Sequence, residues 1–197
     1  MPEHPAAAHT RAWVERAVIG LNLCPFAKAA ETKGLNRYTV SAATDADALL
    51  ADLVVELKHI ASTHAAQLET TLLIHPQVLD DFADFNDFLD RADAAVNGLG
   101  LDGVIQIASF HPRYRFAGTE VDDIGNATNR SPYPTLHLLR EASVERAVAA
   151  FAQSESIYES NIATLERLGA AGWAELERQC ARQADGSSRS ADADPNS

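Results

Sequence analysis

Apolar residues recur along this chain with two different periods, and these periods predict helices that alternate with strands. Spacings of three and four residues indicate amphipathic helices over 10–24, 44–63, 80–98 and 143–151, and a further helical stretch over 157–168 that could continue to about 179. Short runs of β-prone residues predict strands over 37–42, 70–74, 104–110 and 135–140. The predicted order of elements is therefore α-β-α-β-α-β-β-α-α.

Polar residues predict where three of these helices begin. Thr44, with Asp47 three residues later, makes an acidic version of a capping box. Asp80 or Asp81 is placed to cap the third helix, and Ser143 is placed to cap the fourth. Each of these side chains can accept a hydrogen bond from the free N–H groups of a first helical turn.

Helices that separate successive strands imply parallel strands joined by right-handed crossovers. The fourth strand follows the third without a crossover helix, so we expect it to pair antiparallel. The predicted fold class is α/β: a single domain with a mixed, mostly parallel sheet of about four strands flanked by helices. We expect the domain to span 10–183, with a disordered N-terminus over 1–9 and a disordered, polar tail over 184–197.

The composition is typical of a globular chain and limits the partners and the cellular location that we expect. A formal net charge of -12 argues against a nucleic-acid partner, because phosphate binding requires a basic surface. No apolar run is long enough for a membrane span, and the N-terminus lacks a signal-peptide pattern. With only two cysteines, a cytoplasmic location is expected and a disulfide framework is not. The oligomeric state stays open.

The stretch 109–141 gathers polar side chains between two apolar runs. His75 directly follows the second strand and His111 directly follows the third. Carboxyl ends of parallel strands share one edge of a sheet, where ligands of open α/β folds bind. The polar loop over 113–134 starts from that edge and returns to it if the fourth strand is antiparallel. The topology therefore predicts a histidine pair and a polar loop on one rim.

Within this predicted site, His75, His111 and Tyr114 are the candidate catalytic residues, because imidazole exchanges protons near neutral pH. Arg130 is the candidate ligand for an anion, since guanidinium suits carboxylate and phosphate groups. The other candidate substrate-binding residues are Asp123, Asn126, Asn129 and Arg140. The alternative is an ordered Ω-loop whose asparagine and aspartate side chains satisfy its own backbone.

A second chemistry is open to some of the same residues. His75, His111, His137 and Cys24 are candidate ligands for a divalent metal, although their spacing is scattered. Cys24 is also a candidate reactive thiol, because it lies at a predicted helix end near Lys28. A buried structural role is the alternative for His137, on a strand, and for Cys24, which has no CxxC partner.

Four stretches, LNLCPFAK, LLIHP, FHPRYRFAG and TNRSPYPTLHLLRE, resemble a bacterial and plant family catalogued as domain of unknown function 1415. The resemblance covers about 10–169 and implies a complete single-domain member. The family has no assigned activity, so the resemblance implies no catalytic role. Residues 133–136 are also similar to the proline-led strand of thioredoxin-like proteins, and residues 24–26 resemble half of a glutaredoxin-type motif whose second cysteine is absent.

These observations lead to three hypotheses. The preferred one is an enzyme, of open reaction class, that acts on a small anionic substrate through a histidine and arginine pocket at the carboxyl ends of the strands. The second is a metal- or thiol-redox protein that uses Cys24 with the histidine pair. The third is a non-enzymatic module that binds a partner through exposed rings of Tyr114, Phe116 and Tyr133.

Overall fold

Within residues 3–150 and 157–191, which the computed structural model describes, four strands form one mixed sheet in the order β1-β2-β4-β3. They are β1 (Asn36–Val40), β2 (Thr70–Ile74), β3 (Ile105–Phe110) and β4 (Thr135–Arg140). β1 pairs parallel with β2, whereas β4 lies between β2 and β3 and is antiparallel to both. The predicted α/β class, with a mixed sheet and an antiparallel fourth strand, is confirmed. Three of the four strands run in one direction, as a mostly parallel sheet requires, but two of the three pairings are antiparallel because β4 lies between β2 and β3.

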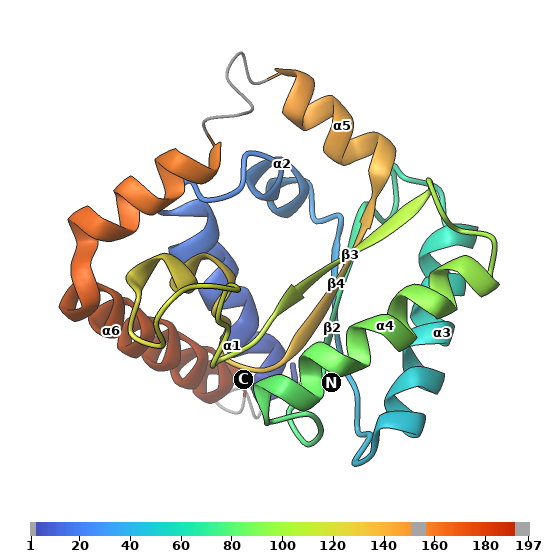
Figure 1. Ribbon diagram of the computed structural model, residues 1–197, viewed down its shortest axis with the longest axis horizontal. Coiled ribbons are helices and arrows are strands. Elements are labelled where there is room, and N and C mark those ends of the chain that lie inside the picture. The colour runs from blue at the N-terminus through green and yellow to red at the C-terminus, as the bar shows by residue number, and fades with distance from the viewer. Residues whose placement is uncertain (1–2, 151–156, 192–197) are drawn as a thin grey trace, which may run out of the picture.

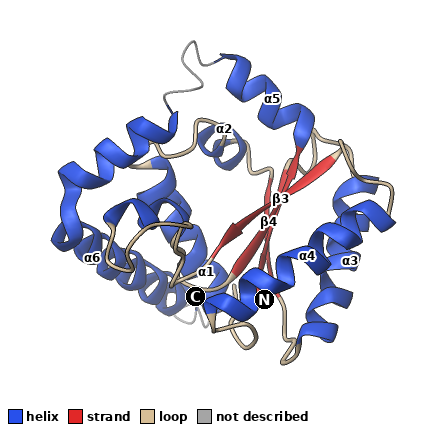
Figure 2. Cartoon of the chain, in the orientation of Figure 1, coloured by secondary structure: helices blue, strands red, loops and turns tan. Residues whose placement is uncertain are grey.

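Helices cover both faces of this sheet (Figures 1 and 2). One face carries α3 (Ala46–Ser62) and α4 (Phe82–Gly98). The other face carries α1 (Pro5–Trp13), the short helices η1 (Val14–Ile19) and α2 (Ala27–Thr32), and the long α6 (Ile157–Ala191). α5 (Glu141–Ala150) extends from the end of β4. Each described helix is too short or too polar to cross a bilayer.

Side chains alternate along the strands and give each face of the sheet its own core. Every residue of β2 is buried, as its unbroken apolar run predicts. Leu73 packs with Phe85 of α4 in the core under α3 and α4. Leu72, its neighbour along the strand, packs on the opposite face with Trp13 of α1 and Trp173 of α6. The sheet is therefore the middle layer of three.

The first helix begins earlier than the sequence pattern predicts. α1 starts at Pro5, so the disorder expected over 1–9 is wrong for residues 5–9. Ala6 and Ala7 are buried against Ile74 at the end of β2, and the His4 ring caps the helix by accepting from the Ala6 N–H at 3.1 Å. Alanine has only a small apolar side chain, so these residues do not produce the apolar periodicity from which the other helices were predicted.

The long C-terminal helix also departs from the prediction. α6 continues to Ala191, so the tail expected from residue 184 is helical as far as 191, and 192–197 lie outside the described residues. Gly169, with φ 67° and ψ 170°, interrupts the helix where the predicted stretch over 157–168 ends. Glycine adopts this positive φ without steric cost. The chain bends there, and its second part lies along α1 (Figure 1).

Two of the predicted helix caps are wrong and one is confirmed. Asp45, not Thr44, caps α3, because its carboxylate accepts hydrogen bonds from two first-turn N–H groups at 3.0 and 2.9 Å. Asp81 caps α4 in the same way. α5 begins at Glu141 directly after β4, two positions before Ser143, so Ser143 lies inside the helix.

Arg140, a candidate substrate-binding residue, instead fastens the end of β4 to the end of α3. Its guanidinium donates to the carbonyl oxygens of Ile60 and Thr63, both at 2.6 Å, and of Leu68 at 3.1 Å. Carbonyls at a helix C-terminus lack partners within the helix. Arg140 lies at the amino end of β3, with Ile105 as its register partner, and so at the opposite edge from the predicted site.

We therefore expect the Arg140→Met substitution to lower the free energy of unfolding by about 2–3 kcal/mol, because several carbonyls would lose a charged donor. Urea denaturation followed by circular dichroism measures this change. Arg178→Met is the control, since Arg178 pairs with Glu175 on the surface and its loss should have no measurable effect. Equal stability of the two variants would contradict the assigned role of Arg140.

Candidate functional site

The sheet brings His75 and His111 to one edge. β2 and β3 run in the same direction because both are antiparallel to β4, which lies between them, so the two histidines follow strand ends at the same edge of the sheet. The polar segment passes directly beside them: the His75 N–H donates to Pro134 O at 3.0 Å, and the His111 N–H donates to Asn129 O at 3.1 Å. Both imidazoles pack on Phe85, with ring centroids 5.8 and 5.1 Å from its ring.

Both rings are fully buried and hold the loop between β2 and α4. His75 Nδ1 lies 3.0 Å from Val78 O, and His111 Nε2 lies 3.1 Å from Leu79 O. A carbonyl oxygen only accepts, so each of these ring nitrogens carries a proton. His111 Nδ1 accepts from the Arg113 N–H at 3.0 Å. The pair therefore ties down a loop in which Leu79 has a φ of 60°, an uncommon value for this residue type.

Burial keeps these histidines neutral. The pKa of His75 is lowered to about 4, mainly by loss of solvation; the bond to Val78 O opposes the shift, and the nearby His111 adds to it. Loss of solvation also lowers the pKa of His111, with Arg113 acting in the same direction. His75 Nε2 has no hydrogen-bond partner among the described residues. At neutral pH both rings are uncharged donors to backbone carbonyls.

His137 and Cys24 lie on the other face of the sheet. His137 pairs with Leu72 in the β2–β4 register, and its Nε2 lies 2.5 Å from Thr70 Oγ1. It lines a small cavity of about 50 Å³ together with Cys24 and Trp13. Loss of solvation lowers the pKa of His137 to about 4 and raises the pKa of the Cys24 thiol.

The sheet thus separates the four candidate metal ligands into two pairs. Within the described part of the chain, no group of three or more His, Cys, Asp or Glu side chains is placed to hold a metal ion. The pKa of Cys24 is also shifted against the thiolate, the form in which cysteine acts as a nucleophile or a metal ligand.

The polar segment uses most of its asparagine and aspartate side chains to order its own backbone. Asp123 caps the short helix η2 (Ile124–Asn129) by accepting from the Gly125 N–H at 2.8 Å. The buried Asn126 accepts from the Phe116 N–H at 3.0 Å and donates to Glu120 O at 2.8 Å. Asn129 donates to Ser109 O at 3.0 Å. These side chains behave as the Ω-loop alternative expects.

The aromatic residues of the segment contact other rings of the chain. Tyr114 is partly buried, with its ring centroid 5.1 Å from that of Phe82 and 5.0 Å from that of Phe116. Tyr133 contacts His9 at 5.6 Å in an edge arrangement. Each of these candidate anchors for a partner protein is therefore packed at least partly within the molecule.

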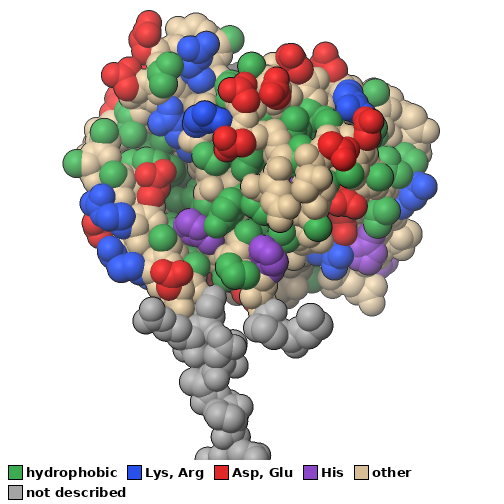
Figure 3. All heavy atoms as spheres, turned by 90° about the horizontal axis from the view of Figure 1, so that it is seen from below, with side chains coloured by type: hydrophobic (Ala, Val, Ile, Leu, Met, Phe, Trp, Pro, Cys, Tyr) green, Lys and Arg blue, Asp and Glu red, His purple; other side chains and the backbone are tan. Residues whose placement is uncertain are grey.

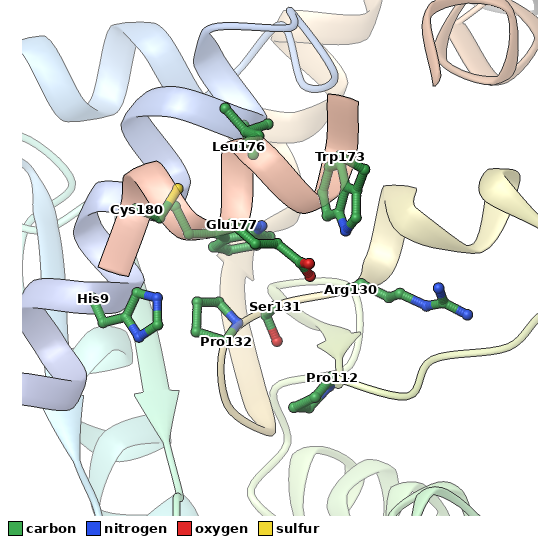
Figure 4. A pocket seen from close by; sticks show the side chains of 11 residues that line it. His9, Pro112, Arg130, Ser131, Pro132, Trp173, Leu176, Glu177 and Cys180 are labelled. Atoms are coloured by element: carbon green, nitrogen blue, oxygen red, sulfur yellow. The ribbon is translucent and has the colours of Figure 1, made fainter. Parts of the chain in front are cut away.

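A pocket of about 230 Å³ opens between the polar segment and the helices α1 and α6 (Figure 4). The polar segment contributes its proline-rich part, α1 and η1 contribute one wall, and α6 contributes the other. The lining residues are His9, Trp13, Ala17, Pro112, Arg130, Ser131, Pro132, Trp173, Leu176, Glu177 and Cys180. Pro112 follows His111, so the pocket lies at the predicted edge of the sheet, on the face opposite to the histidine rings.

Three polar groups of the residues that line this pocket lack partners. One is the buried Nε1–H of Trp13, which finds no acceptor among the described residues. Trp173 is only 5% exposed, and its Nε1–H finds no acceptor among the described residues. Glu177 is exposed and forms no hydrogen bond or salt bridge within the described ranges. In Figure 4 the Glu177 carboxylate and the Trp173 nitrogen both point toward the space beside Ser131. The lining residues therefore supply two buried indole donors without acceptors and one carboxylate.

The remaining polar side chains of the pocket are already engaged. Arg130 donates to Tyr114 O at 3.3 Å and to Val121 O at 2.7 Å, and its guanidinium points away from the other lining side chains (Figure 4). The Ser131 hydroxyl donates to Tyr133 O at 2.6 Å. Arg130 lines the pocket with its stem and braces the polar segment with its charged end.

Comparison with protein families identifies the chain. The family model described as "Protein of unknown function (DUF1415)" matches residues 5–175. The chain belongs to this family. The predicted resemblance is confirmed, and the match includes α1 and, on the α6 wall of the pocket, Trp173, but it ends before Leu176, Glu177 and Cys180. Searches of curated proteins and of solved structures gave no match.

The sequence-based prediction missed the helical walls of this DUF1415 pocket. His9 lies in a stretch expected to be disordered, and Trp173 and Glu177 lie far along the chain from the polar segment. One signal was available: the chain has two tryptophans, Trp13 and Trp173, and both line the pocket. Large aromatic side chains combine apolar surface with one polar atom, a combination that suits ligand sites.

The neutral histidines predict how stability depends on pH. Their pKa values are lower in the folded chain than the ordinary value of 6.5, so below about pH 6.5 the unfolded chain binds protons that the folded chain does not. The free energy of unfolding should therefore be highest above that pH. It should decrease as the pH falls toward about 4, by up to about 1.4 kcal/mol per pH unit for each histidine.

Urea denaturation at several pH values between about 7 and 5 measures this slope, in a range above the titration of most carboxylates. The control is His59→Gln, which removes an exposed imidazole and should leave the slope unchanged. A free energy of unfolding that stays constant over this range would contradict the buried, neutral state of His75 and His137.

Proposed function

We propose that this DUF1415 member binds a small organic molecule in the pocket between α1, α6 and residues 130–132. One observation carries the proposal: the Trp173 Nε1–H is buried, has no acceptor and faces an open volume of about 230 Å³. Buried polar groups in proteins nearly always have a hydrogen-bond partner. A ligand with an acceptor atom supplies the missing partner.

The surroundings of the pocket support this proposal. It lies at the carboxyl edge of β2 and β3, where ligands of open α/β sheets bind. Its walls combine two indole rings with leucine and proline side chains, and polar groups are few. Small-molecule sites have this mainly apolar lining with a small number of placed polar atoms. The volume suits one compact molecule rather than a chain segment.

The finer sequence-based expectations stay proposals. They are an enzyme acting on an anionic substrate, with His75 and His111 as acid and base and Arg130 as the anion ligand, in a cytoplasmic setting. Of these residues, Arg130 lines the pocket, whereas both histidine rings donate to backbone carbonyls on the opposite face of the sheet, so the geometry supports this expectation less well than ligand binding in the pocket. Two further expectations are also proposals: that the chain binds a partner protein, and that it does not bind nucleic acid. Figure 3 shows acidic and basic side chains interspersed on the face seen from below, which supports the second of these.

Tryptophan fluorescence tests the proposal, because both tryptophans of the chain line the pocket. In a screen of small organic compounds by thermal shift, we expect the compounds that raise the melting temperature also to change the tryptophan emission. Trp173→Phe replaces the indole with a smaller aromatic ring that has no N–H, and it should weaken their binding at least about tenfold, the equivalent of one lost hydrogen bond.

The control variant is Tyr158→Phe, which removes a polar group from an exposed ring outside the pocket. Binding to this variant should match the wild type. Compounds that stabilise the protein without altering its emission, and that bind Trp173→Phe as tightly as the wild type, would place the binding site elsewhere.

A further inference from the structure

Glu177 is the acidic side chain among the residues that line the pocket. Its carboxylate is exposed to the pocket, close to Trp173 and Ser131 (Figure 4), and it forms no hydrogen bond or salt bridge with the described residues. Loss of solvation is the main cause that raises the pKa of the neighbouring Cys180 thiol; the charge of Arg16 lowers it, and the charge of Glu177 raises it by less than Arg16 lowers it. A carboxylate without a partner favours a ligand that carries a positive charge.

Positive groups near the pocket are committed to other partners. Arg130 donates to two backbone carbonyls and points away from the lining side chains. Arg16 donates to Gln183 Oε1 on the outside of α6. Loss of solvation lowers the pKa of His9, and the charge of Asp185 only partly opposes this, so His9 is neutral at physiological pH. Among the described residues, Arg130 is thus the arginine that lines the pocket, and its donors are directed to backbone carbonyls rather than toward a ligand.

The walls favour a flat apolar body next to that charge. The indole rings of Trp13 and Trp173 stand at the pocket with Pro112, Pro132 and Leu176. Indole faces attract cations in addition to apolar groups, because the ring carries negative charge on its face. The indole N–H of Trp173 requires an acceptor atom on the same ligand. The charge of the pocket, its apolar walls and its free indole N–H thus favour a ligand that combines a positive group, an apolar body and an acceptor atom.

We infer that the ligand is a compact organic amine, protonated at neutral pH, whose ammonium group faces Glu177 and whose apolar body carries an acceptor atom for Trp173. This inference rests on the proposed function of the pocket and specifies its ligand class. It differs from the anionic substrate that the sequence predicts, because the arginine of the polar segment is engaged and the glutamate of α6 was not foreseen.

Three matched probes test the sign of the charge: 4-methoxybenzylamine, 4-methoxybenzyl alcohol and 4-methoxybenzoate. They share a ring and an ether acceptor and differ in charge. By isothermal titration calorimetry with the full chain, the amine should bind about tenfold more tightly than the alcohol, and the benzoate should bind most weakly. Glu177→Gln should weaken the amine about tenfold and leave the alcohol unchanged.

Glu166→Gln is the matched control, since Glu166 is an exposed glutamate on α6 that does not line the pocket. It should bind all three probes as the wild type does. Benzoate or alcohol binding as tightly as the amine, or amine binding that Glu177→Gln does not change, overturns the inference. Absence of binding by all three probes overturns it as well.

The same titrations separate this inference from the proposed function. Trp173→Phe should weaken the amine and the alcohol alike, because both present the ether oxygen to the indole N–H. If the benzoate binds best and Trp173→Phe weakens it, the pocket is a ligand site for anions, so the amine inference fails and the proposed function stands. If Trp173→Phe changes the affinity of no probe that binds, both fail.

Discussion

The position of β4 determines the functional geometry of this fold. Because β4 lies between β2 and β3 and is antiparallel to both, the other three strands share one direction, although only β1 and β2 are parallel neighbours. The segment that leads into β4 must therefore return to the edge at which β2 and β3 end. Its backbone is hydrogen-bonded to both histidines there, through Pro134 and Asn129. The same pairing places Arg140 at the far edge.

The two faces of the sheet then assign separate roles to residues that are close in sequence. His75 and His111 extend toward α3 and α4, where their rings donate to the backbone of one loop. Pro112, one residue after His111, lines a pocket on the opposite face with α1 and α6. Residues that look like one site in the sequence thus have two roles: the histidines hydrogen-bond to the backbone on one face of the sheet, and Pro112 lines the pocket on the other.

The strands and the edge were predictable from the sequence, whereas the pocket was not. Strands 70–74 and 135–140 were predicted to the residue, the first because an unbroken apolar and β-prone run marks it. The start of α1 was missed because three small alanines give no apolar period. Asn126 and Asp123 were identified as polar and ordered, but sequence cannot tell whether a side chain bonds to its own loop or to a ligand. Glu177 needed tertiary structure, since the bend at Gly169 brings that part of α6 beside α1.

The central claim is that the edge histidines are fixed, neutral donors to the backbone while ligand binding occurs on the other face of the sheet. Two-dimensional ¹H–¹⁵N NMR of histidine-labelled protein at neutral pH tests it most directly, because ring nitrogen shifts identify the tautomer of each imidazole. The account predicts a proton on Nδ1 of His75 and on Nε2 of His111, with neither ring charged. Charged imidazoles, or rings that exchange between tautomers as free histidine does, would contradict it.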